Sequence, residues 1–311
     1  METPLFDARK NLLKIHDLKK YPNRLVWKIN NTCNFSCAYC MNRFENTSNI
    51  VTVYSPEKMR SFFDNIGSWL IMITGGEPFI YPRFVDICKE LENNHYLQVT
   101  TNLSSETIYD FADRINPERV FLLSASFHYI ERNNKKLKDD FIDKCKYLKT
   151  KGFTVLVNYI ALPSTLNSME EDISLFASLG ISSFAVVLRG EFEGKNYPES
   201  YTDKELSIIK KYLLDSNVEL GSAYGKLNYY GHYCSAGKNY FVIDANGDVS
   251  RCSTLYKKTG NFYKGNFILN DHSKPCIVTN CNDGHCGVAA VSDKKAFFIK
   301  MYYDKKAYKR L

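Results

Sequence analysis

Three cysteines near the start of the chain are spaced so that their thiolates can hold one metal cluster. Cys33, Cys37 and Cys40 form a C-x3-C-x2-C pattern just after the apolar run 25–29. Cysteine thiolates are the usual ligands of cubane iron–sulfur clusters, and a cluster held entirely by protein has four of them. Three thiolates leave one iron open, and an open coordination site can bind a substrate or cofactor directly. A zinc-binding loop is the alternative interpretation of this spacing.

A second motif, which consists of Gly75, Gly76, Glu77 and Pro78, follows the next apolar run at residues 69–73. Each motif lies at the end of an apolar run, and together they resemble the signatures of the radical S-adenosylmethionine (radical SAM) superfamily. The resemblance implies that the three cysteines hold a 4Fe–4S cluster and that SAM binds at its open iron. It also implies that the backbone and the acid of the second motif meet the amino group of SAM.

Apolar runs alternate with helix-like segments along the first two thirds of the chain. This alternation predicts a parallel sheet with helices outside it. The six units indicate an α/β fold, and they resemble the partial (βα)6 TIM-like barrel that is typical of radical SAM enzymes. Both motifs follow predicted strands, and parallel barrels gather their ligands at the C-terminal ends of strands. The predicted strands are 25–30, 68–73, 96–101, 119–125, 153–160 and 182–188. One predicted helix starts at residue 55, and the others cover about 82–93, 105–115, 137–150, 168–179 and 203–214.

Other polar and aromatic residues at predicted strand ends are candidates for the SAM site. The resemblance places Tyr39 near the adenine, and it places Asn102, Ser124 and Ser126 near the ribose and the carboxylate. For the three strand-end residues, ordinary capping of strand ends is the alternative. Arg189 ends the sixth predicted strand, where a guanidinium suits the methionine carboxylate as a bidentate partner. A surface ion pair is the alternative for Arg189.

The pattern changes near residue 215, which divides the predicted barrel (1–215) from a small C-terminal extension (216–311). Residues 240–252 predict a β-hairpin whose turn is the Asn-Gly pair at 246–247, the strongest short hairpin signal. Cys234 precedes its first strand and Cys252 ends its second, so antiparallel pairing would bring the two thiols close together. A loop and a basic helix are predicted to follow the hairpin.

This extension resembles the twitch and SPASM extensions of radical SAM enzymes, in which a hairpin flanked by cysteines binds an auxiliary 4Fe–4S cluster. Five cysteines fit the shorter, single-cluster twitch type. We expect Cys234, Cys252, Cys281 and Cys286 to be the ligands, which leaves Cys276 as a thiol that could donate a hydrogen atom. The spacing of the last three does not decide which of them bind. Four thiolates would also satisfy a structural zinc ion.

Two further residues are candidates for catalysis. His128 follows the fourth predicted strand, and histidine is the usual proton carrier near neutral pH. Glu191 lies in the polar, glycine-punctuated segment 189–198, and loops at the mouth of a barrel tend to select the substrate. A structural histidine and a solvated loop are the alternatives.

Composition narrows the class of protein. The chain has 311 residues, ten cysteines and a formal net charge of +7, without a signal peptide or an apolar run that could cross a bilayer. Ten cysteines in such a chain indicate metal ligands or catalytic thiols before disulfides. We therefore expect a cytoplasmic protein. The positive charge weakly favours an anionic substrate, but no dense basic stripe indicates nucleic acid. Cys88 and Cys145 fit helical core positions.

The resemblance implies reductive cleavage of SAM to a 5′-deoxyadenosyl radical that removes hydrogen from an unactivated C–H bond. We expect an electron donor such as flavodoxin or ferredoxin. The favoured substrate is a sugar, aminocyclitol or nucleotide sugar that is dehydrogenated or epimerised. Modification of a ribosomally made peptide is the alternative. About two dozen residues precede the first strand, too few for a leader-binding domain. An iron–sulfur or zinc protein with a degenerate SAM site is the non-enzyme alternative.

Overall fold

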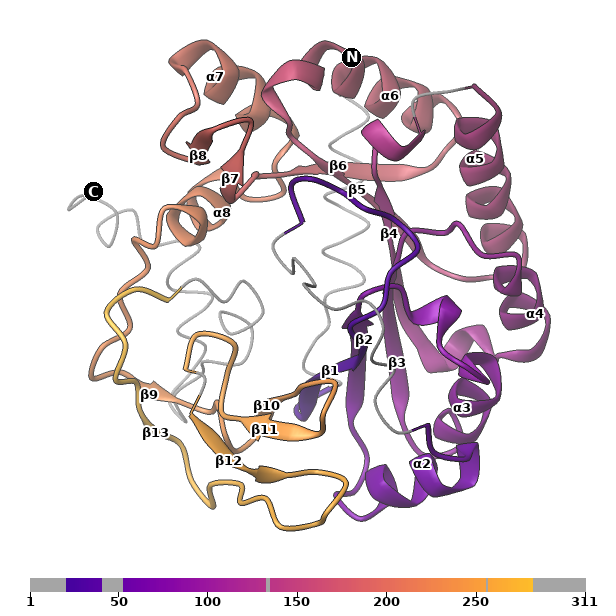
Figure 1. The fold of residues 1–311 in the computed structure, drawn as a ribbon, viewed down its shortest axis with the longest axis vertical. Helices are drawn as coiled ribbons and strands as arrows, with labels where there is room; N and C mark the ends of the chain where they lie inside the picture. The colour runs from indigo at the N-terminus through magenta and orange to yellow at the C-terminus, as the bar shows by residue number, and fades with distance from the viewer. Residues whose placement is uncertain (1–20, 41–52, 133–134, 256, 282–311) are drawn as a thin grey trace.

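The fold is a curved, mainly parallel sheet with helices along one side (Figure 1). The structure is a computed structural model that describes residues 21–40, 53–132, 135–255 and 257–281. Within these residues no helix is both long and apolar enough to span a membrane.

Six consecutive parallel strands form the barrel sheet in the order β1-β2-β3-β4-β5-β6. The predicted partial (βα)6 barrel is thereby confirmed, and each predicted strand overlaps an observed one. The strands are β1 (Arg24–Asn30), β2 (Leu70–Gly75), β3 (Tyr96–Thr101), β4 (Val120–Phe127), β5 (Val155–Ile160) and β6 (Ser182–Val186).

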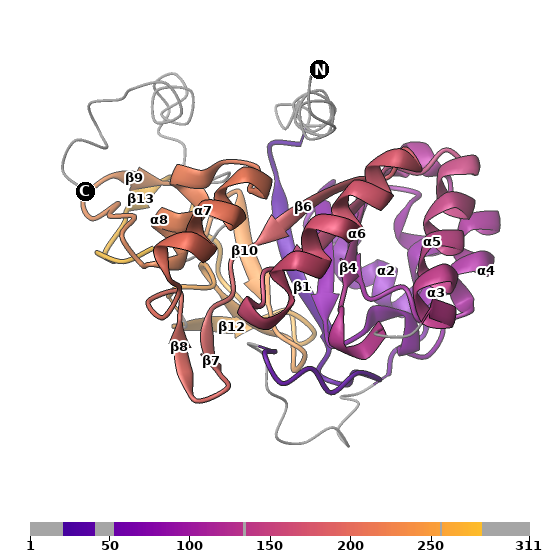
Figure 2. The same cartoon turned by 90° about the horizontal axis from the view of Figure 1, so that it is seen from above.

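All of the helices except the last cover the outer face of the sheet, as Figures 1 and 2 show, and the last lies beside the segment that follows β6. The first of them begins after Ser55, whose hydroxyl accepts the Lys58 amide hydrogen as an N-cap. The helix before last has a capping box between Thr202 and Glu205. The helices are α2 (Pro56–Asp64), α3 (Phe84–Leu91), α4 (Thr107–Arg114), α5 (Lys135–Thr150), α6 (Leu166–Ser178), α7 (Asp203–Tyr212) and α8 (Ser216–Ala223).

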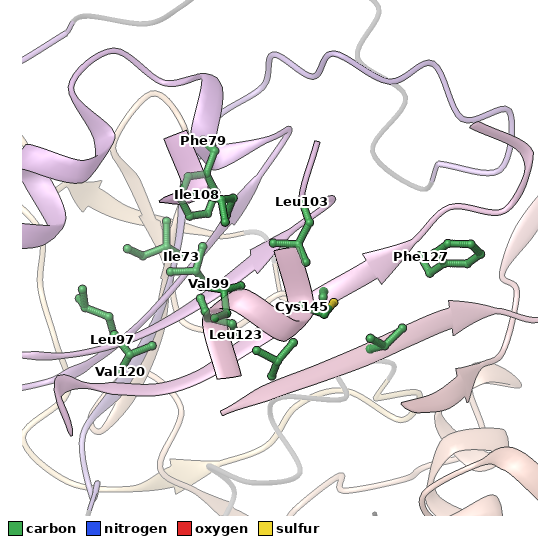
Figure 3. Packing of buried hydrophobic residues seen from close by; sticks show 14 of the residues in the cluster. Ile73, Phe79, Leu97, Val99, Leu103, Ile108, Val120, Leu123, Phe127 and Cys145 are labelled. Carbon is green, nitrogen blue, oxygen red and sulfur yellow. The ribbon is translucent and has the colours of Figure 1, made fainter. Parts of the chain in front are cut away.

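The two faces of the sheet have different side chains. Every second strand residue packs against the helices, as Ile73, Val99 and Leu123 do in the cluster of Figure 3. Strand side chains alternate between faces, so the intervening residues point to the other face. Cys145 lies in the same helix-side cluster and Cys88 is also fully buried there, which confirms both as core cysteines.

The C-terminal hairpin continues the barrel sheet. Its strands β10 (Tyr240–Ile243) and β11 (Asp248–Ser250) pair antiparallel, as predicted, and β10 also pairs in parallel with β1. The turn is longer than predicted. The Asp244 amide donates a hydrogen bond to the Asp248 carbonyl, and the three residues between them end in Gly247, which has a φ of +83°. That geometry is the three-residue loop with a left-handed glycine.

Two further short pairings complete the described extension. Strand β12 (Lys258–Asn261) pairs antiparallel with β11. Strand β13 (Lys274–Pro275) pairs with β9 (Tyr233–Cys234). The predicted C-terminal helix lies outside the described residues.

Candidate cofactor and cluster sites

The Gly-Gly-Glu-Pro motif is held directly against the start of the cysteine loop. The Gly76 amide donates to the Asn30 backbone carbonyl at 3.0 Å, and the Glu77 amide donates to the Thr32 carbonyl at 2.8 Å. The Asn30 carboxamide returns a hydrogen bond to the Glu77 carbonyl at 3.1 Å. The ends of β1 and β2 therefore form one unit that carries both motifs.

Both glycines of the motif are required by close approach of the backbone. A Cβ on Gly76 would lie 1.9 Å from the Thr32 carbonyl oxygen, which is rigid backbone. Gly75 has a φ of +133°, and a Cβ there would lie 2.3 Å from the Asn30 carbonyl oxygen. Only glycine permits this contact.

Glu77 is buried and its carboxylate is directed into the protein. One oxygen accepts from the Phe79 amide at 3.0 Å and from the Thr101 hydroxyl at 2.7 Å. The other accepts from the Asn102 amide at 2.7 Å. Burial raises the pKa of Glu77, and these donors oppose that rise. The carboxylate thus ties the motif to the end of β3, and Pro78 begins a short 3-10 helix beside it.

Asn102 joins the end of β3 to the cysteine loop. Its carboxamide nitrogen donates to the Asn34 side-chain oxygen at 3.0 Å and lies 4.0 Å from the Cys33 sulfur. Its side-chain oxygen accepts from the Ser104 amide at 2.9 Å. The predicted contact of Asn102 with SAM stays a prediction, but the residue lies beside the first cysteine.

Arg132 is a buried positioning residue that the sequence did not reveal. Its guanidinium donates to the Asn102 carbonyl at 2.6 Å and to the Leu137 carbonyl at 2.9 Å. It also lies 5.4 Å from the ring centre of Phe35 and 4.9 Å from that of Phe141. Arg132 therefore braces the cysteine loop from the segment after β4. A lone arginine in a charged stretch carries no sequence signal for this role.

Tyr39 and His128 meet beneath the cysteine loop. The Tyr39 hydroxyl lies 3.0 Å from the His128 Nδ1, and the Phe35 ring contacts the imidazole edge-on. Burial, and then the nearby Arg132 charge, lower the pKa of His128 to about 4. The imidazole is therefore neutral at physiological pH, so its Nδ1 can accept from the tyrosine hydroxyl. Its predicted role as a proton carrier stays a prediction.

The segment after β6 reaches the same end of the sheet (Figure 2). It forms a hairpin of β7 (Gly190–Phe192) and β8 (Lys195–Tyr197), where a loop was predicted. The turn residues Glu193 and Gly194 have φ values of 50° and 71°, as a type I′ turn requires. Phe192 packs edge-on against Tyr39, while the side chain of Glu191 is exposed.

Arg189 is held by the additional helix α8. Its guanidinium donates to the Ser222 hydroxyl at 3.1 Å and lies near Glu219. The predicted contact of Arg189 with the methionine carboxylate therefore stays a prediction. Ser124 and Ser126 point to the face of β4 away from the helices, and Ser124 accepts from the Asn158 carboxamide at 3.0 Å.

We expect Glu219 to make stability fall as pH rises. Burial raises the pKa of Glu219 to about 7 from its ordinary value of 4.5. The unfolded chain therefore releases this proton at lower pH than the folded chain, so stability present below pH 4.5 is lost as pH rises through 7. As the pH rises from 5 to 8, the free energy of unfolding measured with urea should fall on the order of 2 kcal/mol more for the wild type than for Glu219→Gln. Glu118→Gln, on an exposed carboxylate, should follow the wild type. If the free energy of unfolding changed equally with pH in the wild type and in Glu219→Gln, the expectation would be contradicted.

The three motif cysteines fit a cluster-binding loop. All three are partly exposed, and the Cys33 sulfur accepts the Phe35 amide hydrogen at 3.5 Å. Burial raises the pKa of Cys33, and it raises the pKa of Cys37 to about 12. Such thiols become thiolates only beside strong positive charge, which iron supplies.

Four C-terminal cysteines line one pocket between β9, β11 and the segment after β13. They are contributed by three separate stretches of chain, and Arg251 lines the same pocket. Among the described residues, no three Cys, His, Asp or Glu side chains are arranged to hold a single metal ion. The four cysteines are Cys234, Cys252, Cys276 and Cys281.

The local bonding of this pocket suits thiolate ligands. The Ala236 amide donates to the Cys234 sulfur at 3.5 Å, and the Leu255 amide donates to the Cys252 sulfur at 3.3 Å. Arg251 donates to the carbonyls of Ala236 and Lys274 at 2.7 and 2.8 Å, which joins the stretches that carry the cysteines. Hydrogen bonds and positive charge near sulfur stabilise a bound cluster's thiolates.

The structure therefore places Cys276 with the other three, whereas we had expected it to stand apart as a hydrogen donor. Cys286 lies outside the described residues. The choice of the fourth ligand between Cys276 and Cys286 stays a prediction.

Comparisons with known proteins agree with the barrel and its motifs. The radical SAM superfamily model matches residues 27–176. A protein named glucose-1-phosphate adenylyltransferase from Clostridioides difficile (strain 630) is 28% identical over 240 residues, which cover 69% of this chain and 57% of that protein. The GTP 3′,8-cyclase of Campylobacter fetus subsp. fetus (strain 82-40) is 26% identical over 281 residues, which cover 80% of this chain and 84% of that protein.

The fold also resembles Streptococcus suis SuiB bound to its precursor peptide SuiA. The TM-score is 0.57 at 18% identity, over 84% of this chain and 67% of that chain. The residues matched by the superfamily model run from β1 into α6 and include the cysteine loop and the Gly-Gly-Glu-Pro motif. Residues 27–176 therefore form a domain of the radical SAM superfamily, whose members are enzymes.

Proposed function

We propose that this chain cleaves SAM reductively and removes a hydrogen atom from a small-molecule substrate. The observation that carries this proposal is the single unit formed by the two motifs, in which Asn30 and Thr32 hold the Gly-Gly-Glu-Pro backbone beside the cysteine loop. Cys33, Cys37 and Cys40 would hold the radical SAM cluster.

When bound, the clusters and SAM supply a 5′-deoxyadenosyl radical for hydrogen abstraction and, at the auxiliary site, an acceptor for the second electron of a dehydrogenation. The residues of the chain orient these groups. Glu77 and Arg132 fix the motif and the loop, while the buried rings of Tyr39 and Phe192 pack against each other beside the cysteine loop. Such aromatic packing helps to exclude water from a reactive intermediate.

We infer that the C-terminal pocket binds an auxiliary 4Fe–4S cluster. Its ligands would be Cys234, Cys252, Cys276 and Cys281, because these four line one pocket and two of them accept amide hydrogens. Cys286 would then be the thiol left over. A structural zinc ion is the competing occupant, and metal analysis of the purified chain separates the two.

A sugar, aminocyclitol or nucleotide sugar is the favoured substrate class. Two relatives are named for phosphorylated compounds, glucose-1-phosphate and GTP. Peptide modification is the second candidate. The fold resemblance to SuiB with its precursor peptide leads to it, and the side chains of Tyr230, Tyr233 and Ile277, which are 63%, 59% and 60% exposed, offer apolar surface in the extension.

The proposed function is tested by incubating the anaerobically reconstituted chain with SAM and dithionite. We expect 5′-deoxyadenosine and methionine in equal amounts, detected by liquid chromatography and mass spectrometry. With substrate present, a product two mass units lighter would mark dehydrogenation. One solvent deuterium gained without net redox change would mark epimerisation. Absence of 5′-deoxyadenosine from a preparation with full iron content would contradict the proposal.

A further inference from the structure

The sheet face turned away from the helices carries a row of polar side chains. Lys28 on β1 is in register with Thr74 on β2, and Thr100 on β3 is in register with Ser124 on β4. The residues just before Thr74 and Thr100 are themselves paired, so the row is continuous across four neighbouring strands. All four side chains are only partly buried. A row of one amine and three hydroxyls matches a polar, oxygen-rich ligand.

The positive charge of Lys28 in this row is not compensated by acidic residues of the strands. Strands β1 to β6 contain no Asp or Glu, and Lys28 forms no hydrogen bond or ion pair with any residue that the structure describes. The next register position on the β10 side is Asp244. Its carboxylate accepts the amide hydrogens of Asn246 and Asp248 within the hairpin. A partly buried ammonium that pairs with no described carboxylate makes this position favourable for an anion.

The row lies close to the motifs. Lys28 precedes by two residues Asn30, which binds the Gly-Gly-Glu-Pro backbone. Two residues of strand correspond to about 7 Å, and an extended lysine side chain spans a similar length. Lys28 therefore lies about 7 Å along the strand from the residue that holds the Gly-Gly-Glu-Pro backbone. The rest of a small molecule could reach the barrel mouth from there.

We propose that Lys28 binds a phosphate or carboxylate group of the substrate and that Thr74, Thr100 and Ser124 bind adjacent substrate oxygens. Lysine is a point charge that accepts either anion, and hydroxyls donate to or accept from neighbouring oxygens. The inference rests on the proposed function, because it assumes that the substrate binds inside this barrel. To the proposed function it adds that the substrate is negatively charged and that Lys28 is the residue that selects for this charge.

Three probes with one carbon skeleton test the inference: glucose 6-phosphate, gluconate and glucose. Their binding to the reconstituted, SAM-loaded chain is measured by calorimetry. A charged hydrogen bond corresponds to about tenfold or more in affinity, so at least one anionic probe should bind about tenfold tighter than glucose. Lys28→Met should remove this difference, and Lys28→Arg should retain most of it. Lys210→Met, on the exposed surface of α7, is the matched control and should bind like the wild type.

The stronger of the two anionic probes identifies the group that Lys28 prefers. Equal binding of the three probes, no measurable binding of either anion, or anion binding that survives Lys28→Met would each overturn the inference. Iron content and circular dichroism verify that each variant is folded. Formation of 5′-deoxyadenosine by the wild type is measured separately. If SAM is cleaved but no anion binds, only this inference fails, and if anions bind but SAM is not cleaved, only the proposed function fails.

Discussion

Replacing Cys33, Cys37 and Cys40 together with alanine is expected to abolish 5′-deoxyadenosine formation and to lower iron from about eight to about four atoms per chain. Two 4Fe–4S clusters account for the larger number, and the auxiliary cluster alone accounts for the smaller one. The four C-terminal cysteines lie in a separate pocket, so their iron should be retained. Iron and labile sulfide are measured after anaerobic reconstitution.

The double variant Cys88→Ala/Cys145→Ala is the matched control for this measurement. Both thiols are fully buried in the helix-side core, so their removal should lower stability but leave the iron content unchanged. A wild-type value of about four that falls to none in the triple variant would mean that the C-terminal pocket holds no cluster. Unchanged iron in the triple variant would remove the basis of the proposed radical chemistry.

The substitution Glu77→Gln is expected to disrupt the site although it preserves the size of the side chain. The two carboxylate oxygens accept hydrogen bonds on both sides, from Thr101 and Phe79 and from Asn102. A carboxamide has only one oxygen, so its NH2 group must face a donor on one side. Leaving a buried donor unsatisfied costs about 1–3 kcal/mol, and the lost charge adds to this. We expect an apparent free energy of unfolding lower by about 3 kcal/mol and at least tenfold slower SAM cleavage.

The control for this substitution is Glu118→Gln, whose side chain is exposed. It should match the wild type in both measurements. Electron paramagnetic resonance of the reduced protein with and without SAM distinguishes a displaced motif from a merely weakened fold, because a displaced motif should abolish the SAM-induced change in the spectrum. Wild-type stability and cleavage in Glu77→Gln would show that the carboxylate does not hold the motif.

The elements of the barrel could be predicted because their signals are local. Each strand is an apolar run, and helices such as α2 and α7 begin with a cap or a proline that the sequence shows. Helix α8 was missed, since Ser216–Ala223 is short and has no apolar stripe. The pairing of β10 with β1 was also missed, because it joins residues more than 200 positions apart and no short pattern encodes a parallel partner.

Only the sequence motifs of the candidate site could be predicted, whereas the features that depend on burial or strand pairing could not. The cysteine spacing and the glycine pair are sequence motifs, and the close approach at Gly76 explains why the glycine is required. Arg132 and the inward direction of the Glu77 carboxylate depend on burial, which the fold creates. The grouping of Cys276 with Cys234 depends on pairing between β9 and β13, two strands of two residues each that carry no pattern.

The parallel pairing of β1 with β10 has a consequence for synthesis of the chain on the ribosome. Arg24 lies opposite Tyr240, so 216 positions separate the partners. At 5–20 residues per second, roughly 10 to 40 s pass before the second partner emerges. During this time one edge of β1 has unpaired backbone groups that could pair with another nascent chain. A protein shortened before β10 would keep that edge permanently, and we expect it to aggregate rather than fold as an independent barrel.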